Sequence, residues 1–133
     1  MTSQTIPVEP FDLIVFGATG DLAERKLLPA LYQRQRAGQF SEPTRIIGTS
    51  RSELDDEQYR SFGRKAISAH VAKEDIEDDE LDRFIARLSY VSADATTDRG
   101  LGDLKAAIGN SDTVRAFYLA VAPTLFGDIV NGI

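Results

Sequence analysis

The stretch "FDLIVFGATGDLAERK", from Phe11 to Lys26, constrains the fold of this chain more than any other. It begins with a mainly apolar run at residues 12–16, which is typical of a strand buried on both faces, as in a parallel sheet. Gly17 and Gly20 follow at once, and a helical pattern comes directly after them. Nucleotide-binding folds use this order of strand, glycine turn and helix to place the turn that holds phosphate groups.

The rest of the chain alternates between strand and helix patterns. We predict further strands at residues 45–51, 88–94 and 115–123, and helices at 22–38, 101–108 and from 124, with two more inside 53–88. Pro29 should remove one hydrogen bond from the first of these helices and kink it. The alternation predicts an α/β, Rossmann-like fold with a mostly parallel sheet flanked by helices, in strand order 3-2-1-4 and incomplete. Residues 1–10 are expected to be a loose tail, and residues 11–133 one dinucleotide-binding domain.

The composition narrows the classes of partner. The chain has 133 residues, a net charge of −6 and no cysteine. An acidic chain does not favour nucleic acid or an anionic membrane as a partner, and a chain without cysteine has neither disulfides nor a thiolate metal site. No apolar run approaches a membrane span, and the first ten residues show no secretory signal. We expect a cytoplasmic protein with no metal site.

The glycine turn has a physical use at this position. Glycines let the backbone adopt positive φ and approach a diphosphate closely, and the helix start beyond them offers free N–H groups. The pattern is G-x-x-G-x-x-A, from Gly17 through Gly20 to Ala23, and a small third residue still allows the helix to pack on the strand. The Thr19 hydroxyl would lie within reach of a phosphate. The alternative is a purely structural turn, with Thr19 as a turn or cap residue.

The end of the second predicted strand indicates which cofactor is bound. Folds that prefer NAD place Asp or Glu there to bind the ribose 2′-hydroxyl. This chain instead has Gly48, Thr49, Ser50 and Arg51, and a guanidinium makes charge-assisted bonds with a 2′-phosphate. The sequence therefore favours NADP. The alternative is a solvated arginine paired with Glu53.

Two charged residues after the turn are less easily explained by packing. Asp21 either caps the first helix and complements its dipole or belongs to the cofactor site. Lys26 lies near the expected mouth of the ligand crevice, where it is either solvated or holds an anionic substrate as a point charge.

The stretch "FGATGDLAERKLLPALY" resembles the glucose-6-phosphate dehydrogenase family, in which a G-A-S/T-G-D-L-A motif is followed by R-K-L and P-x-L. The later stretches "RIIGTSR", "YVSAD", "FYLAVAP" and "LFGDIV" agree with that family in order. Nucleotide binding in general does not require the G-D-L-A, R-K and proline elements. The resemblance is therefore more specific than the glycine pattern alone.

The resemblance implies roles for individual residues. Residues 17–22 would hold the NADP diphosphate, and Arg51 would bind the 2′-phosphate. Asp94 and Ala95 would lie near the adenine and residues 118–123 near the nicotinamide. Lys26 would face either the phosphate end of the substrate or the catalytic crevice. In full, the implied cofactor residues are Gly17, Ala18, Thr19, Gly20, Asp21, Leu22, Arg51, Asp94, Ala95 and Pro123.

Two family elements are absent from this chain: a lysine-proline motif, and an arginine-isoleucine-aspartate-histidine-tyrosine segment that supplies the base. The single histidine, His70, lies in the helical region and is expected to be structural or exposed, so no catalytic residue is predicted here. Glu24 also departs from the family, which often has a base there. We therefore expect a fragment of a two-domain enzyme whose base lies beyond Ile133.

For the whole enzyme, the resemblance implies oxidation of glucose 6-phosphate to 6-phosphogluconolactone by hydride transfer to NADP, in the pentose phosphate pathway. It also implies a homo-oligomer that assembles through the missing domain. Two other functions remain open from the sequence. One is an NADP-dependent reductase of the extended short-chain type, and the other is a nucleotide-sensing module without chemistry of its own.

Overall fold

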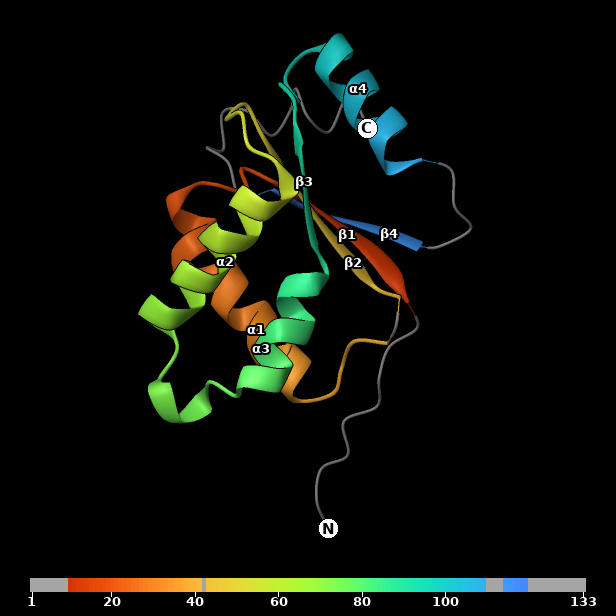
Figure 1. Ribbon diagram of the computed structural model, residues 1–133. Coiled ribbons are helices and arrows are strands. Elements are labelled where there is room, and N and C mark those ends of the chain that lie inside the picture. Colours follow the sequence, from red (N-terminus) through yellow and green to blue (C-terminus); the bar gives the residue numbers. More distant parts are fainter. Residues whose placement is uncertain (1–9, 42, 110–113, 120–133) are drawn as a thin grey trace.

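The computed structural model describes residues 10–41, 43–109 and 114–119, and it shows a parallel sheet with helices on both faces (Figure 1). The strands are β1 (Phe11–Phe16), β2 (Arg45–Ser50), β3 (Leu88–Ser92) and β4 (Val114–Leu119). They lie in the order β3-β2-β1-β4, and each neighbouring pair is parallel. The predicted fold class and strand order are confirmed.

The helical elements are η1 (Ala23–Leu27), α1 (Leu28–Arg36), α2 (Asp56–His70), η2 (Lys73–Asp75), α3 (Asp78–Ala86) and α4 (Asp98–Ile108). In Figure 1, α1, α2 and α3 lie on one side of the sheet and α4 lies on the other. Both helices predicted inside 53–88 are present. The helix predicted from residue 124 lies outside the described residues, and none of the described helices is long and apolar enough to cross a membrane.

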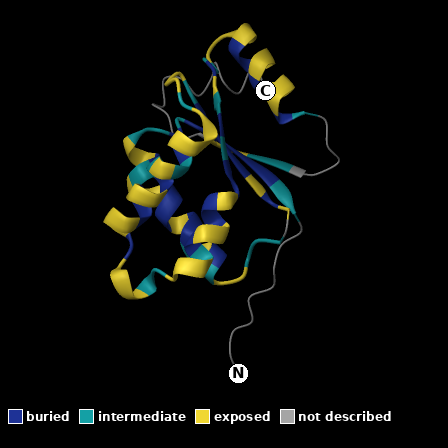
Figure 2. Ribbon diagram, in the orientation of Figure 1, coloured by how far each residue is buried: buried dark blue, intermediate teal, exposed yellow. Residues whose placement is uncertain are grey.

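The apolar run of β1 is buried on both faces of the sheet. Leu13 and Val15 pack in the cluster beneath α1, α2 and α3, whereas Ile14 and Phe16 pack in the cluster beneath α4. Consecutive residues of a strand point to opposite faces, so a strand covered on both sides must be apolar at nearly every position. Figure 2 shows the result as a dark, buried β1 between helices whose outer faces are exposed.

The first helix differs from its prediction as one helix over 22–38. Residues Ala23–Leu27 form a π-helical turn, in which the Leu28 N–H donates to the Ala23 carbonyl five residues back. The α-helix proper starts at Leu28 but continues directly from the π turn, because Leu27 and Leu28 both have helical backbone angles. Pro29 therefore lies inside a helical segment, as predicted, and has no N–H to donate there. The disturbance expected at Pro29 therefore takes the form of a π turn immediately before it. The helix ends at Arg36, and Gly38 (φ +73°) follows.

The fourth predicted helix begins earlier than its apolar pattern indicates, at Asp98 rather than Leu101. Thr97 caps it, because the Thr97 hydroxyl oxygen accepts a hydrogen bond of 3.0 Å from the Gly100 N–H. A polar first turn has no apolar periodicity, so the pattern missed it. Residues 120–123, predicted as the end of the fourth strand, lie outside the described ranges.

The parallel topology brings the candidate site together. Adjacent parallel strands end at the same edge of a sheet, and β1, β2 and β3 are neighbours in this one. The registers pair Phe16 with Thr49 and Ser50 with Ser92. The glycine turn after β1, Arg51 after β2 and Asp94 after β3 therefore share one edge, at which open α/β sheets bind their ligands.

Candidate nucleotide-binding site

The glycine turn is hydrogen-bonded to the end of β2. The Gly17 and Ala18 N–H groups both donate to the Thr49 carbonyl, at 3.0 and 3.1 Å, and the Gly20 N–H donates to the Gly17 carbonyl at 3.0 Å. Gly17 has a φ of +75°, a conformation that other residues rarely adopt. Gly20 does not have a positive φ, so only the first of the two glycines uses this freedom.

The helix that follows offers N–H groups to a ligand. Its first bond runs from the Glu24 N–H to the Gly20 carbonyl at 3.1 Å, so the N–H groups of Asp21, Leu22 and Ala23 lie ahead of the first intrahelical bond. Groups of this kind carry the partial positive charge of a helix start and suit a phosphate. Asp21 and Leu22 are exposed, while Ala23 is fully buried.

Three hydroxyl groups meet beside this turn. Thr19 Oγ1 lies 3.0 Å from Ser50 Oγ and 3.4 Å from Ser52 Oγ, and the Ser52 N–H donates to Ser50 Oγ at 3.3 Å. The hydroxyls therefore connect the glycine turn to the loop after β2. Ser50 and Ser52 flank Arg51, whose side chain is exposed. Within the described ranges Arg51 forms no ion pair, so the predicted alternative of a pair with Glu53 is not seen.

Two buried tyrosines support the turn and the loop from below. The Tyr59 hydroxyl, on α2, donates to the Ala18 carbonyl at 3.1 Å. The Tyr90 hydroxyl, on β3, donates to the Ser52 carbonyl at 2.7 Å and also pairs with the Ser50 hydroxyl. The two ring centroids lie 5.2 Å apart.

The protonation of these tyrosines follows from their burial. Burial raises the pKa of Tyr59, and the neighbouring Tyr90 raises it further. Burial also raises the pKa of Tyr90, although hydrogen bonds with Ser50 oppose that effect. Both hydroxyls therefore keep their proton at neutral pH and act as donors. Sequence reasoning missed both residues, because a buried aromatic on a strand or helix reads only as core.

Asp94 lies just after β3 in a turn of its own. The Thr96 N–H and hydroxyl both donate to Asp94 Oδ1, at 3.0 and 2.6 Å. These bonds lower the pKa of the Asp94 carboxyl, and the positive charge of Arg51 lowers it slightly more. Arg51 and Asp94 lie at the same end of the sheet, because they follow the paired strand residues Ser50 and Ser92. Ala95 is partly buried against the cluster beneath α4.

The remaining predicted residues surround the first helix or lie elsewhere. Lys26 is exposed on η1. The Asp21 side chain accepts from Arg25 Nε at 2.6 Å, and no capping bond from it is seen among the described residues. Its place at the helix start still allows its charge to complement the dipole. Pro123 lies outside the described residues.

The departure at Glu24 has a structural counterpart. Glu24 Oε2 lies 3.0 Å from Nε2 of His70, so this pair connects η1 to the end of α2. The expectation that His70 is structural or exposed agrees with this position.

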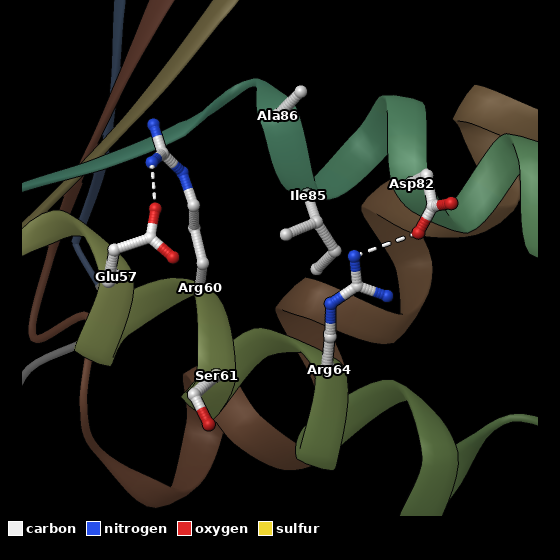
Figure 3. Close-up of a pocket in the computed structure, with 7 residues that line it drawn as sticks. All are labelled: Glu57, Arg60, Ser61, Arg64, Asp82, Ile85 and Ala86. Carbon is white, nitrogen blue, oxygen red and sulfur yellow. Dashed lines mark hydrogen bonds and ion pairs between the residues drawn. The ribbon is translucent and has the colours of Figure 1, made fainter.

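A surface pocket between α2 and α3 is not the predicted site. Figure 3 shows its lining of Glu57, Arg60, Ser61, Arg64, Asp82, Ile85 and Ala86. Arg60 Nη1 donates to Glu57 at 2.7 Å and Arg64 Nη2 donates to Asp82 at 2.8 Å. Each arginine is balanced by a carboxylate, and the lining contains none of the predicted cofactor residues.

The site at the sheet edge fits an anionic dinucleotide. It combines a positive-φ glycine turn, the free amides of a helix start, three hydroxyls and an exposed guanidinium. Amide and hydroxyl donors suit a diphosphate, and a guanidinium suits a phosphate monoester.

Comparison with known proteins agrees with this geometry. Residues 14–133 match the family model described as the NAD binding domain of glucose-6-phosphate dehydrogenase. The glucose-6-phosphate 1-dehydrogenase of Rhizobium meliloti (strain 1021) is 55% identical over 130 residues, which are 97% of this chain and 26% of that protein. The enzyme of the same name from Mycolicibacterium smegmatis is 46% identical over 96% of this chain and 27% of its own length.

Solved structures with the same fold were also found. The crystal structure of glucose-6-phosphate 1-dehydrogenase from Mycobacterium avium has a TM-score of 0.82 at 33% identity, covering 92% of this chain and 26% of its own. A glucose-6-phosphate dehydrogenase in complex with its substrate glucose-6-phosphate has a TM-score of 0.78 at 30% identity, covering 99% of this chain and 28% of its own. The chain spans about a quarter of the length of the relatives it matches. The chain belongs to the glucose-6-phosphate dehydrogenase family and corresponds to its NAD binding domain.

Proposed function

We propose that this chain is the NADP-binding part of a longer glucose-6-phosphate dehydrogenase. The family match supports the enzyme class and argues against a reductase of the extended short-chain type. The chain matches only about a quarter of each relative's length. This supports the proposal that the chain corresponds to one part of such an enzyme.

The observation that carries the preference for NADP is the end of β2. Arg51 stands between Ser50 and Ser52, where folds that bind NAD place an acid. Its guanidinium is exposed and makes no ion pair within the described ranges, so it is available to a 2′-phosphate. The hydroxyls of Thr19 and Ser52, which lie 3.4 Å from each other, would add neutral donors.

The turn itself supports the proposed contacts to the diphosphate. Gly17, Ala18 and Gly20 shape the backbone, and the N–H groups of Asp21 and Leu22 would donate to the diphosphate. The family resemblance, rather than the geometry, implies that residues 94–95 would border the adenine and that Pro123, which lies outside the described residues, would border the nicotinamide.

The substrate and the chemistry are part of the same proposal. One similar structure is named for a complex with its substrate glucose-6-phosphate. Bound NADP would accept a hydride from C1 of that sugar to give 6-phosphogluconolactone. This chain would hold and orient the cofactor, with exposed Lys26 on the substrate side, and the base that takes the C1 hydroxyl proton would come from the rest of the enzyme.

The test compares two cofactors and one variant. Calorimetric titration of the full-length protein should show tighter binding of NADP than of NAD. Arg51→Ala should weaken NADP binding at least about tenfold, since charge-assisted bonds contribute roughly 1.5–3 kcal/mol, and should leave NAD nearly unchanged. An equal loss for both cofactors would contradict the role of Arg51.

A nucleotide-sensing module is the other function to exclude. Such a protein would bind NADP tightly but would not reduce it. An assay of glucose 6-phosphate oxidation by the full-length protein separates the two, because only the dehydrogenase forms NADPH. The expected homo-oligomer and cytoplasmic location stay predictions.

A further inference from the structure

We propose that Tyr90 is a positioning residue for cofactor selectivity: its hydroxyl fixes the loop that carries Arg51, so that NADP is preferred through a residue that does not touch it. This inference rests on the proposed NADP-binding function. The main effect of Tyr90 is on the 2′-phosphate, because both Tyr90 hydroxyl contacts used here go to Ser50 and Ser52 of the loop after β2, and Tyr90 reaches the glycine turn only indirectly, through the hydroxyl pair of Ser50 and Thr19.

The hydrogen bonds of the loop form a directed chain. The Tyr90 hydroxyl has one hydrogen, and the Ser52 carbonyl at 2.7 Å is its nearest carbonyl acceptor, ahead of the Ser50 carbonyl at 3.2 Å. The Ser50 hydroxyl can then donate to the Tyr90 oxygen, and the Thr19 hydroxyl can donate to Ser50. Every hydroxyl hydrogen in this chain has an acceptor, so the arrangement is self-consistent.

The Thr19 hydroxyl can leave this series of hydrogen bonds and bind a ligand without leaving another group unpaired. If the Thr19 hydroxyl turns toward a phosphate oxygen, Ser50 still accepts the Ser52 N–H at 3.3 Å and still donates to Tyr90. No buried group loses its last partner, and the loop stays in place. Among the four residues joined by these hydrogen bonds, only Tyr90 is buried, with 7% of its surface exposed.

The loop position matters because Arg51 is exposed and long. A flexible side chain loses rotamer freedom when it binds a phosphate, and a flexible backbone would add to that loss. Tyr90 holds the residues on both sides of Arg51, through the Ser50 hydroxyl and the Ser52 carbonyl. Tyr90 is itself held by its ring contact with Tyr59 and by its N–H, which donates to Asp56 Oδ1 at 2.8 Å.

The paired tyrosine provides a matched control. Tyr59 is buried beside Tyr90 and also donates one hydrogen bond to a backbone carbonyl, but that carbonyl belongs to Ala18 in the diphosphate turn. NADP and NAD share the diphosphate and differ only in the 2′-phosphate. Loss of the Tyr59 hydroxyl should therefore affect both cofactors alike, whereas loss of the Tyr90 hydroxyl should affect mainly NADP.

The experiment uses two ligands that differ only in the 2′-phosphate, 2′,5′-ADP and 5′-AMP, titrated into the full-length protein by calorimetry. Tyr90→Phe should weaken 2′,5′-ADP binding about fivefold, the equivalent of one hydrogen bond, and leave 5′-AMP within about twofold. Tyr59→Phe should change both ligands by the same factor. Tyr32→Phe, which loses a buried hydroxyl bonded to Asp75 and Glu77, should change neither.

The outcomes separate this inference from the function on which it rests. A wild-type protein that binds both ligands equally would overturn the NADP proposal and the role of Tyr90 with it. A selective wild-type protein whose selectivity survives in Tyr90→Phe would overturn the role of Tyr90 alone, as would an equal loss for both ligands. If Tyr90→Phe does not fold, Ser50→Ala removes one of the two Tyr90 contacts to the loop and should lower the affinity for 2′,5′-ADP more than that for 5′-AMP, and an equal loss for both ligands would overturn the role of Tyr90.

Discussion

The hydroxyl of Tyr59 donates a hydrogen bond of 3.1 Å to the carbonyl of Ala18, and this bond ties the second helix to the glycine turn. Tyr59 is 0% exposed, and so is Ala18. The two residues are 41 positions apart in the sequence, so the bond is a tertiary contact that holds the turn against the body of the domain. The conformation of the turn is therefore fixed both by the Tyr59 hydrogen bond and by the positive φ of Gly17.

Tyr59→Phe should destabilise the protein by about 1–3 kcal/mol, because the buried Ala18 carbonyl loses this donor and no water replaces it. Urea unfolding would measure the change. The control is Tyr118→Phe, since Tyr118 is 37% exposed, and its loss should stay within about 0.5 kcal/mol. Equal stability of Tyr59→Phe and the wild type would mean that the hydrogen bond contributes nothing.

Gly48→Ala should destabilise the protein through crowding. A Cβ at Gly48 would lie 2.7 Å from the Ala18 Cβ and 2.8 Å from the Tyr59 Cζ, so the turn or the ring must move. Overpacking of this kind costs about 1–3 kcal/mol. Gly102→Ala is the matched control, because nothing lies within 4 Å of its added Cβ on α4, and there alanine should stabilise by about 0.5–1 kcal/mol. Melting temperatures that fall equally in both variants would refute the crowding argument.

The sheet was predictable because its pattern is strong. Strands buried on both faces must be apolar almost throughout, and the run from Leu13 to Phe16 shows this directly. The π turn before Pro29 was not predictable in form, because a missing N–H can be absorbed by a kink, a break or a wider turn. The start of α4 at Asp98 was missed because a capped polar turn has no apolar periodicity.

The candidate site was predictable where its residues follow strand ends. Gly17, Arg51 and Asp94 each come shortly after a strand, and parallel strands end at one edge, so their proximity followed from the order of elements. The support from Tyr59 and Tyr90 was not predictable, because a single sequence does not show which buried hydroxyl meets which backbone carbonyl. Long-range side-chain contacts of this kind depend on packing rather than on local pattern.

Arg45→Ala should lower the free energy of unfolding by more than is usual for an exposed arginine. Arg45 donates two hydrogen bonds, of 2.9 and 2.7 Å, to the carboxylate of Asp12, whose side chain is 2% exposed. Removing the arginine leaves a buried carboxylate unpaired, at a cost of about 3 kcal/mol in the free energy of unfolding. Asp12→Asn should cost less, because the amide oxygen still accepts and Arg45 reaches solvent.

The control for that pair is Arg64→Ala. Arg64 and Asp82 form an ion pair of 2.8 Å in which both side chains are largely exposed. Exposed pairs contribute at most about 1 kcal/mol, so this variant should be nearly as stable as the wild type in the same urea experiment. Similar losses in the two arginine variants would show that burial of Asp12 does not control the cost.

Asp94 should titrate below its ordinary pKa of 3.8, because Thr96 donates two hydrogen bonds to it and Arg51 adds a positive charge nearby. A carboxyl whose pKa is lower in the folded state stabilises the fold above its unfolded pKa, and this contribution is lost as the pH falls below 3.8. Carboxyl NMR titration should show that Thr96→Ala raises the pKa of Asp94 more than Arg51→Ala does, since the hydrogen bonds are the larger cause. The reverse order would contradict this prediction, because it would mean that the charge of Arg51, and not the hydrogen bond from the Thr96 hydroxyl, is the larger cause of the shift.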